Sequence, residues 1–429
     1  MNSRLVDERV VSQSVIHQRC VGCGFRIPSL AMSSQCPKCS NSLEYVLEPG
    51  GRFRSLEGIW RYSDFLPISD SRNVIPAVVG GSEIIELPEM SNALRGARLF
   101  LKLDCCSNPT GTFKDREGAI IISRCKELGL DNLVFYSTCN TGRSYTHFAS
   151  ISRLTSYCFM PLECRYKFTD SIARGSRNFI IMVDDDYRTI GPYAKDFARR
   201  NKLNAIAPLH DRTESYTTVA YEQHEQMPDC EYFAQTIASG MGPIGFLRGQ
   251  ENLVKLGMRR KSQIPRIICV QAEQSNSIYR AFISGKTTIT AKDLTEPSKP
   301  MYEPTLNSTN PVANYPELYK CLTVSNGLIT DASPHDVERE GMALMNSLER
   351  RKIWLRFDLE KSLLIGFAGL VRLAVEGKIQ AAERVLLLAT GRAERQSTCP
   401  IPPDLVIRPS VDDPEDVLLR LNHIAESRK

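Results

Sequence analysis

The feature that most constrains the fold is the alternation of short apolar runs with longer stretches of helical periodicity. The apolar runs at residues 133–137, 232–237 and 384–389 each lie next to such a stretch. Strands that alternate with helices form a mainly parallel sheet covered by helices. We therefore predict an α/β fold, and 429 residues are enough for two or three domains.

The composition is that of an ordinary globular protein. Hydrophobic residues make up 42%, charged residues 24%, and the net charge is +5, so neither nucleic acid nor a membrane is expected as a partner. No run approaches eighteen apolar residues, and residues 1–19 lack the apolar core of a signal peptide. Most cysteines are scattered through expected strands and helices, which indicates a reducing cytoplasm instead of a disulfide framework.

Four cysteines form two evenly spaced pairs near the N-terminus. Cys20 and Cys23 are followed by Cys36 and Cys39, with tight turns expected inside each pair. This spacing predicts a zinc ribbon in which the four thiolates bind one tetrahedral ion. The alternative is a degenerate ribbon that keeps its cysteines without the metal. The segment lacks a dense basic and aromatic face, so a structural role is expected.

One lysine stands at the start of an expected helix. In residues 108–116, Pro109 and Gly111 punctuate the chain, and a helical pattern begins at Phe113, directly before Lys114. The partial positive charge of a helix N-terminus lowers the pKa of a neighbouring ammonium group. Only a free amine attacks an aldehyde, so Lys114 is a candidate for imine formation. The alternative is a surface lysine in a loop.

Two further turns follow apolar strands and precede helices. Asn140 and Thr141 lie between the strand at residues 133–137 and a helix expected at residues 143–154. Ligands of open α/β sheets bind at such strand ends, although helix capping would also explain Asn140. The glycine-rich residues 238–245 lie between a strand and a helix expected at residues 246–256, where a phosphate would be favoured.

Later in the chain, residues 286–328 are rich in proline and asparagine and are expected to form a long loop. The last apolar strand, at residues 384–389, stops at Thr390 and Gly391. A hydroxyl at the carboxyl end of a strand points to the same edge of the sheet as the other candidate groups.

In their order and spacing, these stretches resemble the threonine synthase family of pyridoxal-phosphate (PLP) enzymes over nearly the whole chain. The resemblance implies fold type II: two twisted α/β sheet domains with the cofactor between them, plus a small N-terminal zinc-ribbon-like module. The implied limits are 1–47 for the module, 48–134 and 212–429 for a large PLP-binding α/β domain, and 135–211 for a small α/β domain. A homodimer is expected. The matching stretches are the paired cysteines, residues 60–62 and 66–67, 108–116, 137–142, 239–245, 270–273 and 390–391.

The resemblance also implies roles in cofactor binding. Lys114 would be the catalytic residue that forms the internal Schiff base, and Asn140 would bond to the phenolate oxygen of PLP. Thr390 would meet the pyridine nitrogen, and a neutral hydroxyl there favours elimination and replacement over transamination. The phosphate of the cofactor would be bound by Gly240, Met241, Gly242 and Ile244.

For the substrate, Thr138 and Thr141 would help to hold the carboxylate. The implied reaction is loss of phosphate from O-phosphohomoserine or O-phosphoserine, followed by addition of a nucleophile. Within the family, the sequence at Glu117, Arg143 and His147 resembles that of cysteate synthases, which use O-phosphoserine and sulfite. Arg143 and His147 are one helical turn apart and would hold a phosphate or sulfite, unless they are solvated helix residues.

The chain departs from threonine synthases at residues 79–85 and 359–363, which surround the substrate more than the cofactor. PLP is therefore a firmer expectation than threonine synthesis. Two alternatives to the synthase remain open. One is a dehydratase-type enzyme that stops after elimination, and the other is a catalytically silent protein whose zinc ribbon is a binding module.

Overall fold

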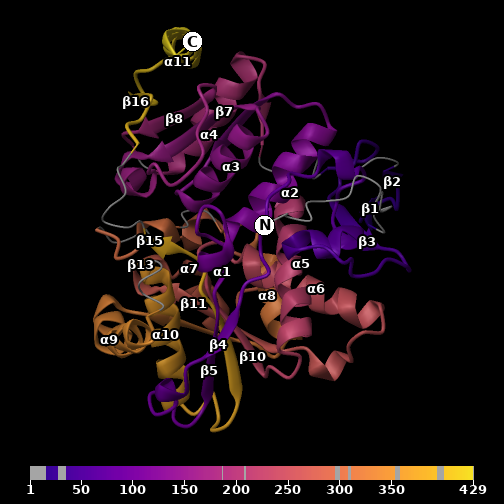
Figure 1. Cartoon of the computed structure of the whole chain (residues 1–429), viewed down its shortest axis with the longest axis vertical. Helices are drawn as coiled ribbons and strands as arrows, with labels where there is room; N and C mark the ends of the chain where they lie inside the picture. Colours follow the sequence, from indigo (N-terminus) through magenta and orange to yellow (C-terminus); the bar gives the residue numbers. More distant parts are fainter. Residues whose placement is uncertain are drawn as a thin grey trace. The chain divides into compact units, whose positions relative to one another are not determined.

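The computed structural model describes residues 16–27, 35–185, 187–206, 209–294, 300–307, 311–352, 358–393 and 401–428. Its contacts divide the chain into two compact units (Figure 1). The first unit comprises Met1–Val79, Lys114–Thr218 and Gln396–Lys429, and the second comprises Gly80–Phe113 and Val219–Arg395. The small domain expected at residues 135–211 thus forms the middle of a larger unit, which also includes the helix after Lys114 and the C-terminal segment.

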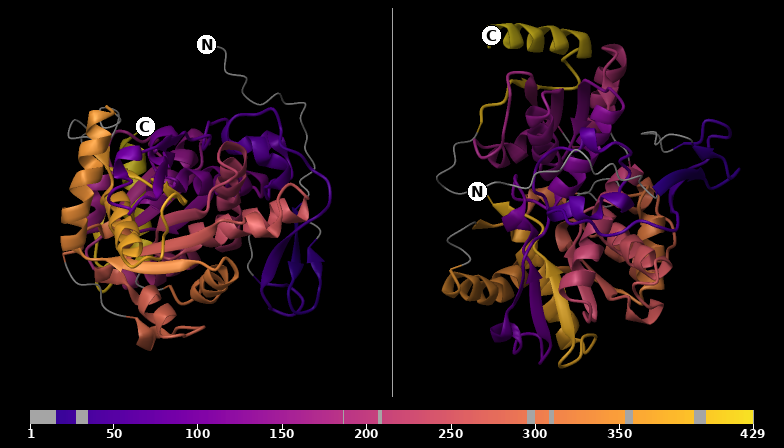
Figure 2. Two further views of the ribbon diagram at one scale, coloured as in Figure 1. Left: turned by 90° about the horizontal axis from the view of Figure 1, so that it is seen from below. Right: turned by 45° about the vertical axis from the view of Figure 1, so that its right-hand side comes forward.

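The first unit contains a five-stranded parallel sheet in the order β16-β8-β7-β6-β9. Its helices include the C-terminal α11, which packs on α4 (Figure 2). The helix α5 begins in this unit and continues into the second. The strands are β6 (Asn132–Tyr136), β7 (Thr155–Pro161), β8 (Asn178–Val183), β9 (Asn204–Ala205) and β16 (Leu405–Ile407). The helices are α2 (Lys114–Glu127), α3 (Asn140–Ile151), α4 (Tyr187–Arg200), α5 (Leu209–Gln226) and α11 (Pro414–Ser427).

Burial explains why the middle strands of this sheet read as continuous apolar runs. Every residue of β7 and of β8 is buried, as expected for a parallel sheet covered on both faces. Tyr157 of β7 stacks on Phe179 of β8 with ring centroids 5.3 Å apart, and Phe197 of α4 packs on Tyr157. The strand predicted at residues 133–137, which forms β6 beside β7, is confirmed.

The cysteine-rich segment is a three-stranded antiparallel sheet with β1 (Ile16–Cys20) between β2 (Arg26–Ile27) and β3 (Leu43–Leu47). Tyr45 of β3 donates a hydrogen bond to Asp211 of α5. The other oxygen of Asp211 lies 3.4 Å from Nε of Arg124, on α2. The ribbon is therefore hydrogen-bonded to α5 at a carboxylate that also pairs with α2.

The second unit contains a six-stranded sheet in the order β12-β11-β10-β14-β5-β4, in which only β4 is antiparallel to its neighbour. A two-stranded sheet, β13-β15, lies in the same unit. The strands are β4 (Ile84–Glu86), β5 (Arg98–Lys102), β10 (Tyr232–Thr236), β11 (Arg266–Ala272), β12 (Leu328–Ala332), β13 (Asp358–Leu359), β14 (Arg384–Leu388) and β15 (Arg392–Ala393). The helices are α1 (Asp104–Ser107), α6 (Met241–Lys255), α7 (Ser277–Ile283), α8 (Tyr315–Val324), α9 (Pro334–Arg350) and α10 (Lys361–Val375).

Short 3-10 helices connect several of these elements in both units. They are η1 (Gly58–Phe65), η2 (Ser71–Asn73), η3 (Pro88–Met90), η4 (Leu162–Lys167), η5 (Lys261–Gln263), η6 (Glu273–Ser275), η7 (Ala291–Asp293) and η8 (Pro304–Leu306).

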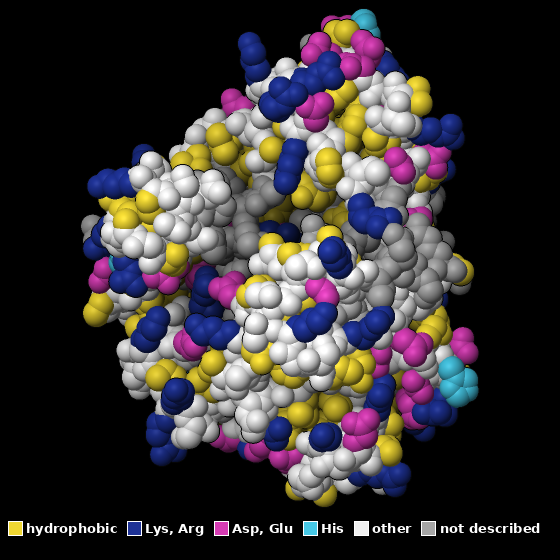
Figure 3. Space-filling view, turned by 180° about the vertical axis from the view of Figure 1, so that it is seen from behind, with side chains coloured by type: hydrophobic (Ala, Val, Ile, Leu, Met, Phe, Trp, Pro, Cys, Tyr) yellow, Lys and Arg dark blue, Asp and Glu magenta, His cyan; other side chains and the backbone are white. Residues whose placement is uncertain are grey.

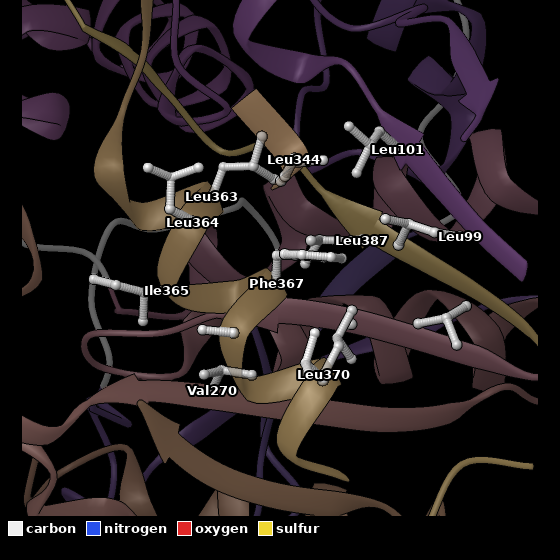
Figure 4. Close-up of a cluster of buried hydrophobic side chains, with 14 of the residues drawn as sticks. Leu99, Leu101, Val270, Leu344, Leu363, Leu364, Ile365, Phe367, Leu370 and Leu387 are labelled. Carbon is white, nitrogen blue, oxygen red and sulfur yellow. The ribbon is translucent and has the colours of Figure 1, made fainter. Parts of the chain in front are cut away.

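The core of the second unit lies between its sheet and α10, whose side chains point onto the strands (Figure 4). Phe367 and Leu370 of α10 are fully buried, and Leu387 of β14 packs in the same cluster. Complete burial of side chains of this size stabilises a fold by about 1.5–3 kcal/mol each. The close approach of α10 to β11 requires Gly369, because a Cβ there would lie 2.5 Å from the side chain of Val270.

Part of the region expected to be a long loop is helical. Residues 315–324 form α8, so the loop prediction for residues 286–328 is wrong there. Proline is tolerated in the first turn of a helix, and Pro316 occupies that position in α8. The buried Leu318, Cys321 and Leu322 give α8 an apolar face, and α8 packs against α6. This face had the signature of a helix, but the surrounding prolines and asparagines obscured it.

The described surface mixes charges of both signs. On the face in Figure 3, lysine and arginine side chains are interspersed with aspartate and glutamate. Within the described residues, every helix falls short of the length and apolarity needed to cross a membrane.

Candidate active site

The loop before Lys114 is fixed to the end of β14 by hydrogen bonds within the second unit. Asn108 accepts a bond from the backbone N–H of Gly80 at 2.8 Å and donates to the Thr112 carbonyl at 3.0 Å. Phe113 donates its backbone N–H to the Thr390 carbonyl at 2.8 Å. Gly111 has φ 73°, and a Cβ there would collide with the side chain of Arg392. The loop therefore has one firm conformation up to the residue before Lys114.

Lys114 is the first residue of α2, so the predicted helix start is confirmed within a residue. Its Nζ donates a hydrogen bond to the hydroxyl of Tyr216, on α5, at 2.9 Å. Burial lowers the pKa of Lys114 to about 8, and Arg212 adds to this effect against the opposing influence of Glu117. More of the amine is therefore uncharged near neutral pH than in an ordinary lysine.

A carboxylate lies beside this amine, one helical turn along α2. Glu117 is fully buried, and its Oε2 lies 3.5 Å from Lys114 Nζ. The hydroxyl of Tyr216 donates to the same carboxylate, and the hydroxyl of Tyr145, on α3, donates to Oε1 at 2.7 Å. Nε of Arg212 lies 2.6 Å from Oε1. Lys114 thus borders a polar cluster that is built from three helices.

Sequence patterns identify Glu117 only as a feature of one family branch and give no role to Tyr145, Arg212 or Tyr216. The spacing of three residues between Lys114 and Glu117 is a signal for a side-chain pair on a helix. The residues of α5 carry no such signal, because they are about a hundred positions away in the chain.

The turn around Asn140 has a strained start. Cys139 has φ 142°, and its backbone N–H donates to Ser137 Oγ at 2.9 Å. Such conformations are rare outside glycine and occur often at functional sites. Asn140 and Thr141 are the first two residues of α3, which begins three residues earlier than the predicted start at Arg143. Residues Asn140 to Gly142 are weak helix formers, but the bond from Arg143 N–H to the Cys139 carbonyl closes the first turn.

The predicted substrate residues lie on both sides of this turn. The Thr138 carbonyl accepts a bond from the Cys164 thiol at 2.9 Å. Arg143 is fully buried, and its Nη2 lies 3.5 Å from Ser171 Oγ. His147 Nδ1 accepts the backbone N–H of Ala173 at 3.0 Å. Both α3 side chains therefore contact residues 171–173, and their role in anion binding stays a prediction.

Protonation of His147 is disfavoured by its surroundings. Burial lowers its pKa, and the neighbouring Arg143 lowers it further. Any anion bound at this place would therefore be neutralised by Arg143 more than by His147.

The glycine corner lies in the second unit, between β10 and α6. Gly240 is left-handed, with φ 81°, and α6 begins at Met241, five residues earlier than the predicted start at Phe246. A Cβ on Gly242 would lie 2.4 Å from Oε1 of Gln235, so a larger residue would displace the Gln235 amide. This Oε1 is buried and has no hydrogen-bond partner among the described residues. This oxygen is an acceptor, so a phosphate at this corner would be bound by the backbone N–H groups at the start of α6.

Thr390 follows β14, and its hydroxyl is linked to a second buried carboxylate. Its Oγ1 lies 3.2 Å from Ser362 Oγ, which donates to Oε2 of Glu360 at 2.7 Å. Oε1 of Glu360 lies 3.4 Å from Thr305 Oγ1, whose shorter bond of 2.8 Å is donated to Glu303. Gly391 is required for this arrangement, because a Cβ there would lie 2.5 Å from Glu360 Oε2.

The four cysteines of the ribbon converge as predicted. The Sγ atoms of Cys20, Cys23, Cys36 and Cys39 all lie within 4.8 Å of one another. Cys20 and Cys39 are separated by 3.4 Å, and Cys23 and Cys36 by 3.7 Å, which is far longer than a disulfide bond. Backbone N–H groups of residues 22 and 23 donate to Cys20, as in zinc knuckles. The cluster fits a tetrahedral zinc ion.

Comparisons with known proteins agree with this arrangement. Residues 75–391 match the protein family described as pyridoxal-phosphate dependent enzyme. The chain is 25% identical over 415 residues to a threonine synthase of Methanocaldococcus jannaschii, covering 92% of this chain and 95% of the relative. It is 25% identical over 416 residues to a cysteate synthase of Methanoculleus marisnigri, covering 91% of this chain and 92% of the relative.

The fold is shared with a solved structure of low sequence identity. The processed form of threonine deaminase isoform 2 from Solanum lycopersicum is 12% identical, with a TM-score of 0.55 and 100% of both chains covered. The predicted fold type II and the prediction of a PLP-dependent lyase or synthase are confirmed at the level of the family. Because the family match covers well over half of the chain, the protein belongs to the pyridoxal-phosphate-dependent enzymes.

Proposed function

We propose that the protein removes phosphate from an O-phosphorylated amino acid, either O-phosphohomoserine or O-phosphoserine, and adds a nucleophile in its place. Relatives named threonine synthase and cysteate synthase, matched over nearly their whole length, support this reaction. The observation that carries the proposal is Lys114, a helix-start amine whose pKa burial lowers to about 8. Such an amine can bond to an aldehyde cofactor and later move a proton at the α-carbon of the substrate.

The residues proposed to hold PLP are those that the family resemblance implies. Lys114 would form the covalent link, Asn140 would bond to the phenolate oxygen, and Thr390 would meet the pyridine nitrogen. When bound, PLP would withdraw electrons from the carbon that carries the substrate amine. The left-handed conformation of Gly240 and the helix N-terminus at Met241 support a phosphate site at the start of α6. That site would be formed by Gly240, Met241, Gly242 and Ile244.

For the substrate, we propose that Thr138 and Thr141 help to hold the carboxylate at the start of α3. Their position on either side of Asn140 supports this role. Arg143 and His147 would act on the phosphate or sulfite. Since His147 is disfavoured as a cation, Arg143 would supply most of the positive charge.

Zinc is proposed as a structural ion of the ribbon, bound by Cys20, Cys23, Cys36 and Cys39. The convergence of the four sulfurs supports it. A site of four thiolates also requires reduced cysteines, which supports the proposed cytoplasmic location. The proposed homodimer would be tested by light scattering of the purified protein.

Phosphate release tests the reaction most directly. The purified protein would be supplied with PLP and with O-phosphohomoserine or O-phosphoserine, with and without sulfite. Threonine from O-phosphohomoserine alone would favour the threonine synthase-like reaction, and sulfite-dependent cysteate from O-phosphoserine the cysteate synthase-like one. Phosphate release without incorporation of a nucleophile would favour the dehydratase-type alternative. A colourless protein that releases no phosphate would reject the enzyme and leave the silent ribbon protein.

A further inference from the structure

The buried carboxylate of Glu117 is unusual beside a lysine that must lose its proton. A carboxylate 3.5 Å from the amine favours the ammonium form, which cannot attack an aldehyde. Glu117 is also fully buried, so its charge requires compensation from nearby groups. The surroundings of Glu117 therefore decide whether it hinders or helps Lys114.

Arg212 supplies the compensating charge. Its Nε lies 2.6 Å from Oε1 of Glu117, and the Tyr145 hydroxyl donates to the same oxygen at 2.7 Å. Burial by itself would raise the pKa of Glu117, but Arg212, Lys114 and the tyrosine hydroxyls outweigh burial and lower it. Glu117 and Arg212 thus form an ion pair whose two charges have opposite effects on the pKa of Lys114.

Tyr216 sets the direction of the hydrogen bonds between Glu117 and Lys114. Its single hydroxyl proton is donated to Oε2 of Glu117, so its oxygen can only accept a bond from Lys114 Nζ, at 2.9 Å. Burial raises the pKa of Tyr216 well above its ordinary value, and Glu117 raises it further, so the hydroxyl keeps its proton. One N–H of Lys114 is consequently held on Tyr216, and this orients the rest of the amine.

The groups that face Lys114 come from each helix packed around it in the first unit. Glu117 is on its own helix, and Tyr216 and Arg212 are on α5. From α3, Tyr145 lies behind Glu117, and Ser144 Oγ donates to the Lys114 carbonyl at 3.1 Å. The charges among these groups are those of Glu117 and Arg212, which oppose each other.

We propose that Tyr216, Glu117 and Arg212 are positioning residues for Lys114, with Tyr216 orienting its amine, Glu117 fixing the Tyr216 hydroxyl, and Arg212 cancelling the Glu117 charge. The inference rests on the proposed function, in which Lys114 binds PLP. It goes beyond that function because it gives the cluster control over the protonation and direction of the amine.

Charge-changing variants test the role of the pair. In the full-length protein without cofactor, the reaction of Lys114 with acetic anhydride would be followed from pH 6 to pH 10 by peptide mass spectrometry. Arg212→Gln leaves Glu117 uncompensated, so labelling at pH 7 should fall about tenfold if the lysine pKa rises by one unit. Glu117→Gln leaves Arg212 uncompensated and should increase labelling.

The double variant Glu117→Gln/Arg212→Gln removes both charges and should return labelling toward the wild-type rate. Arg212→Lys keeps the positive charge and should resemble the wild type. Circular dichroism would establish that each variant is folded. If a single variant does not fold, the double variant still tests the charge role by its labelling rate. Shifts in the same direction for Arg212→Gln and Glu117→Gln, or no shift in either, would overturn the charge role.

The orienting role of Tyr216 is tested against a matched hydroxyl. Tyr216→Phe removes the acceptor for Lys114, whereas Tyr145→Phe removes a hydroxyl that donates to the other oxygen of the Glu117 carboxylate. Tyr216→Phe should slow covalent capture of PLP, followed by visible absorbance, while acetic anhydride labelling is maintained. Tyr145→Phe should affect capture less. Equal slowing in both variants would refute an orienting role for Tyr216.

The two measurements separate this inference from the proposed function. If wild-type Lys114 forms no covalent link with PLP, the proposed function fails, whatever the labelling shows. If the link forms but the labelling of the charge variants does not follow the expected order, only the positioning role fails.

Discussion

Two buried carboxylates of this protein, Glu117 and Glu360, each accept a hydrogen bond from a hydroxyl that also contacts a candidate site residue. Their surroundings differ. In the first unit, the Tyr216 hydroxyl connects Glu117 to Lys114, and a guanidinium lies 2.6 Å from the carboxylate. In the second unit, Ser362 connects Glu360 to Thr390, and the contacts along this path are between hydroxyls and the carboxylate.

The difference follows from what each terminal group has to do. An amine that changes protonation is sensitive to every nearby charge, so a carboxylate beside it requires a balancing cation. A threonine hydroxyl does not titrate, so a carboxylate behind it only has to orient the intervening hydroxyl. The first cluster should therefore respond to changes of charge, and the second to changes of hydrogen-bond geometry.

The largest difference in activity is expected between substitutions of Lys114 and of Thr390, the residues at the ends of these two hydrogen-bond paths. Lys114→Ala should abolish the covalent link to PLP and reduce phosphate release by about 10²- to 10⁴-fold, because it removes the proposed proton-transfer group. Thr390→Val should retain the link, since it changes only a neutral contact. Borohydride reduction followed by peptide mass spectrometry measures the link. A link that persists in Lys114→Ala would show that another lysine is used.

The second-largest effect is expected on the free energy of unfolding when the charge pair of the first cluster is broken. Arg212→Gln leaves Glu117 as a buried carboxylate without its guanidinium, and breaking buried pairs in this way destabilises by about 3–5 kcal/mol. Because the Arg212 side chain keeps 26% of its surface exposed, we expect a value at or below the lower end of that range. Urea midpoints would measure the change. Arg339→Gln, which breaks an exposed pair with Glu340, is the control and should leave the midpoint nearly unchanged.

The pH dependence of stability tests the charge balance at Lys114. Its pKa is about 8 in the folded protein and 10.5 as an ordinary lysine, so below pH 8 folding holds a buried ammonium at a free-energy cost. Between these values the unfolded chain binds more protons, and stability should rise with pH. Lys114→Met should therefore be more stable than the cofactor-free wild type at pH 7, with an advantage that shrinks above pH 8. An advantage that is constant from pH 6 to pH 10 in urea titrations would contradict the lowered pKa.

The smallest effect is expected at the hydroxyl path of the second unit. Ser362→Ala removes the bond to Glu360 at 2.7 Å and should destabilise by about 1–2 kcal/mol. The dependence of PLP binding on pH should keep its wild-type shape, because the variant changes no charge. A shifted pH profile in Ser362→Ala would mean that Glu360 acts through its charge, as Glu117 does.

Elements with strong periodicity could be predicted from the sequence. The buried strands β6, β7, β10 and β14 are continuous apolar runs, and the cysteine spacing specified the ribbon. The helices α3 and α6 were placed too late, because Asn140 and Gly240 are residues of turns as well as of helix starts. Local propensity cannot separate these states when tertiary contacts, such as those that exclude a Cβ at Gly242, select one of them.

The residues of the candidate site also fall into those with a local sequence signal and those without one. Lys114, Asn140 and Thr390 lie in stretches with recognisable local order, so the sequence makes them candidates, and their roles stay predictions. Arg212 and Tyr216 are on a polar helix whose periodicity gives no sign of which side chains meet α2. Their contacts with Glu117 depend on the packing of α5, and only the folded chain reveals them.

The contact between Tyr45 and Asp211 has a consequence for the history and engineering of the chain. Asp211 binds the ribbon, and the next residue, Arg212, neutralises Glu117. Deleting the ribbon would remove a hydroxyl from a carboxylate that also lies beside Arg124 of α2. The ribbon is therefore joined to the same helix that balances the charge beside Lys114, so a shortened chain without it would change the surroundings of that helix.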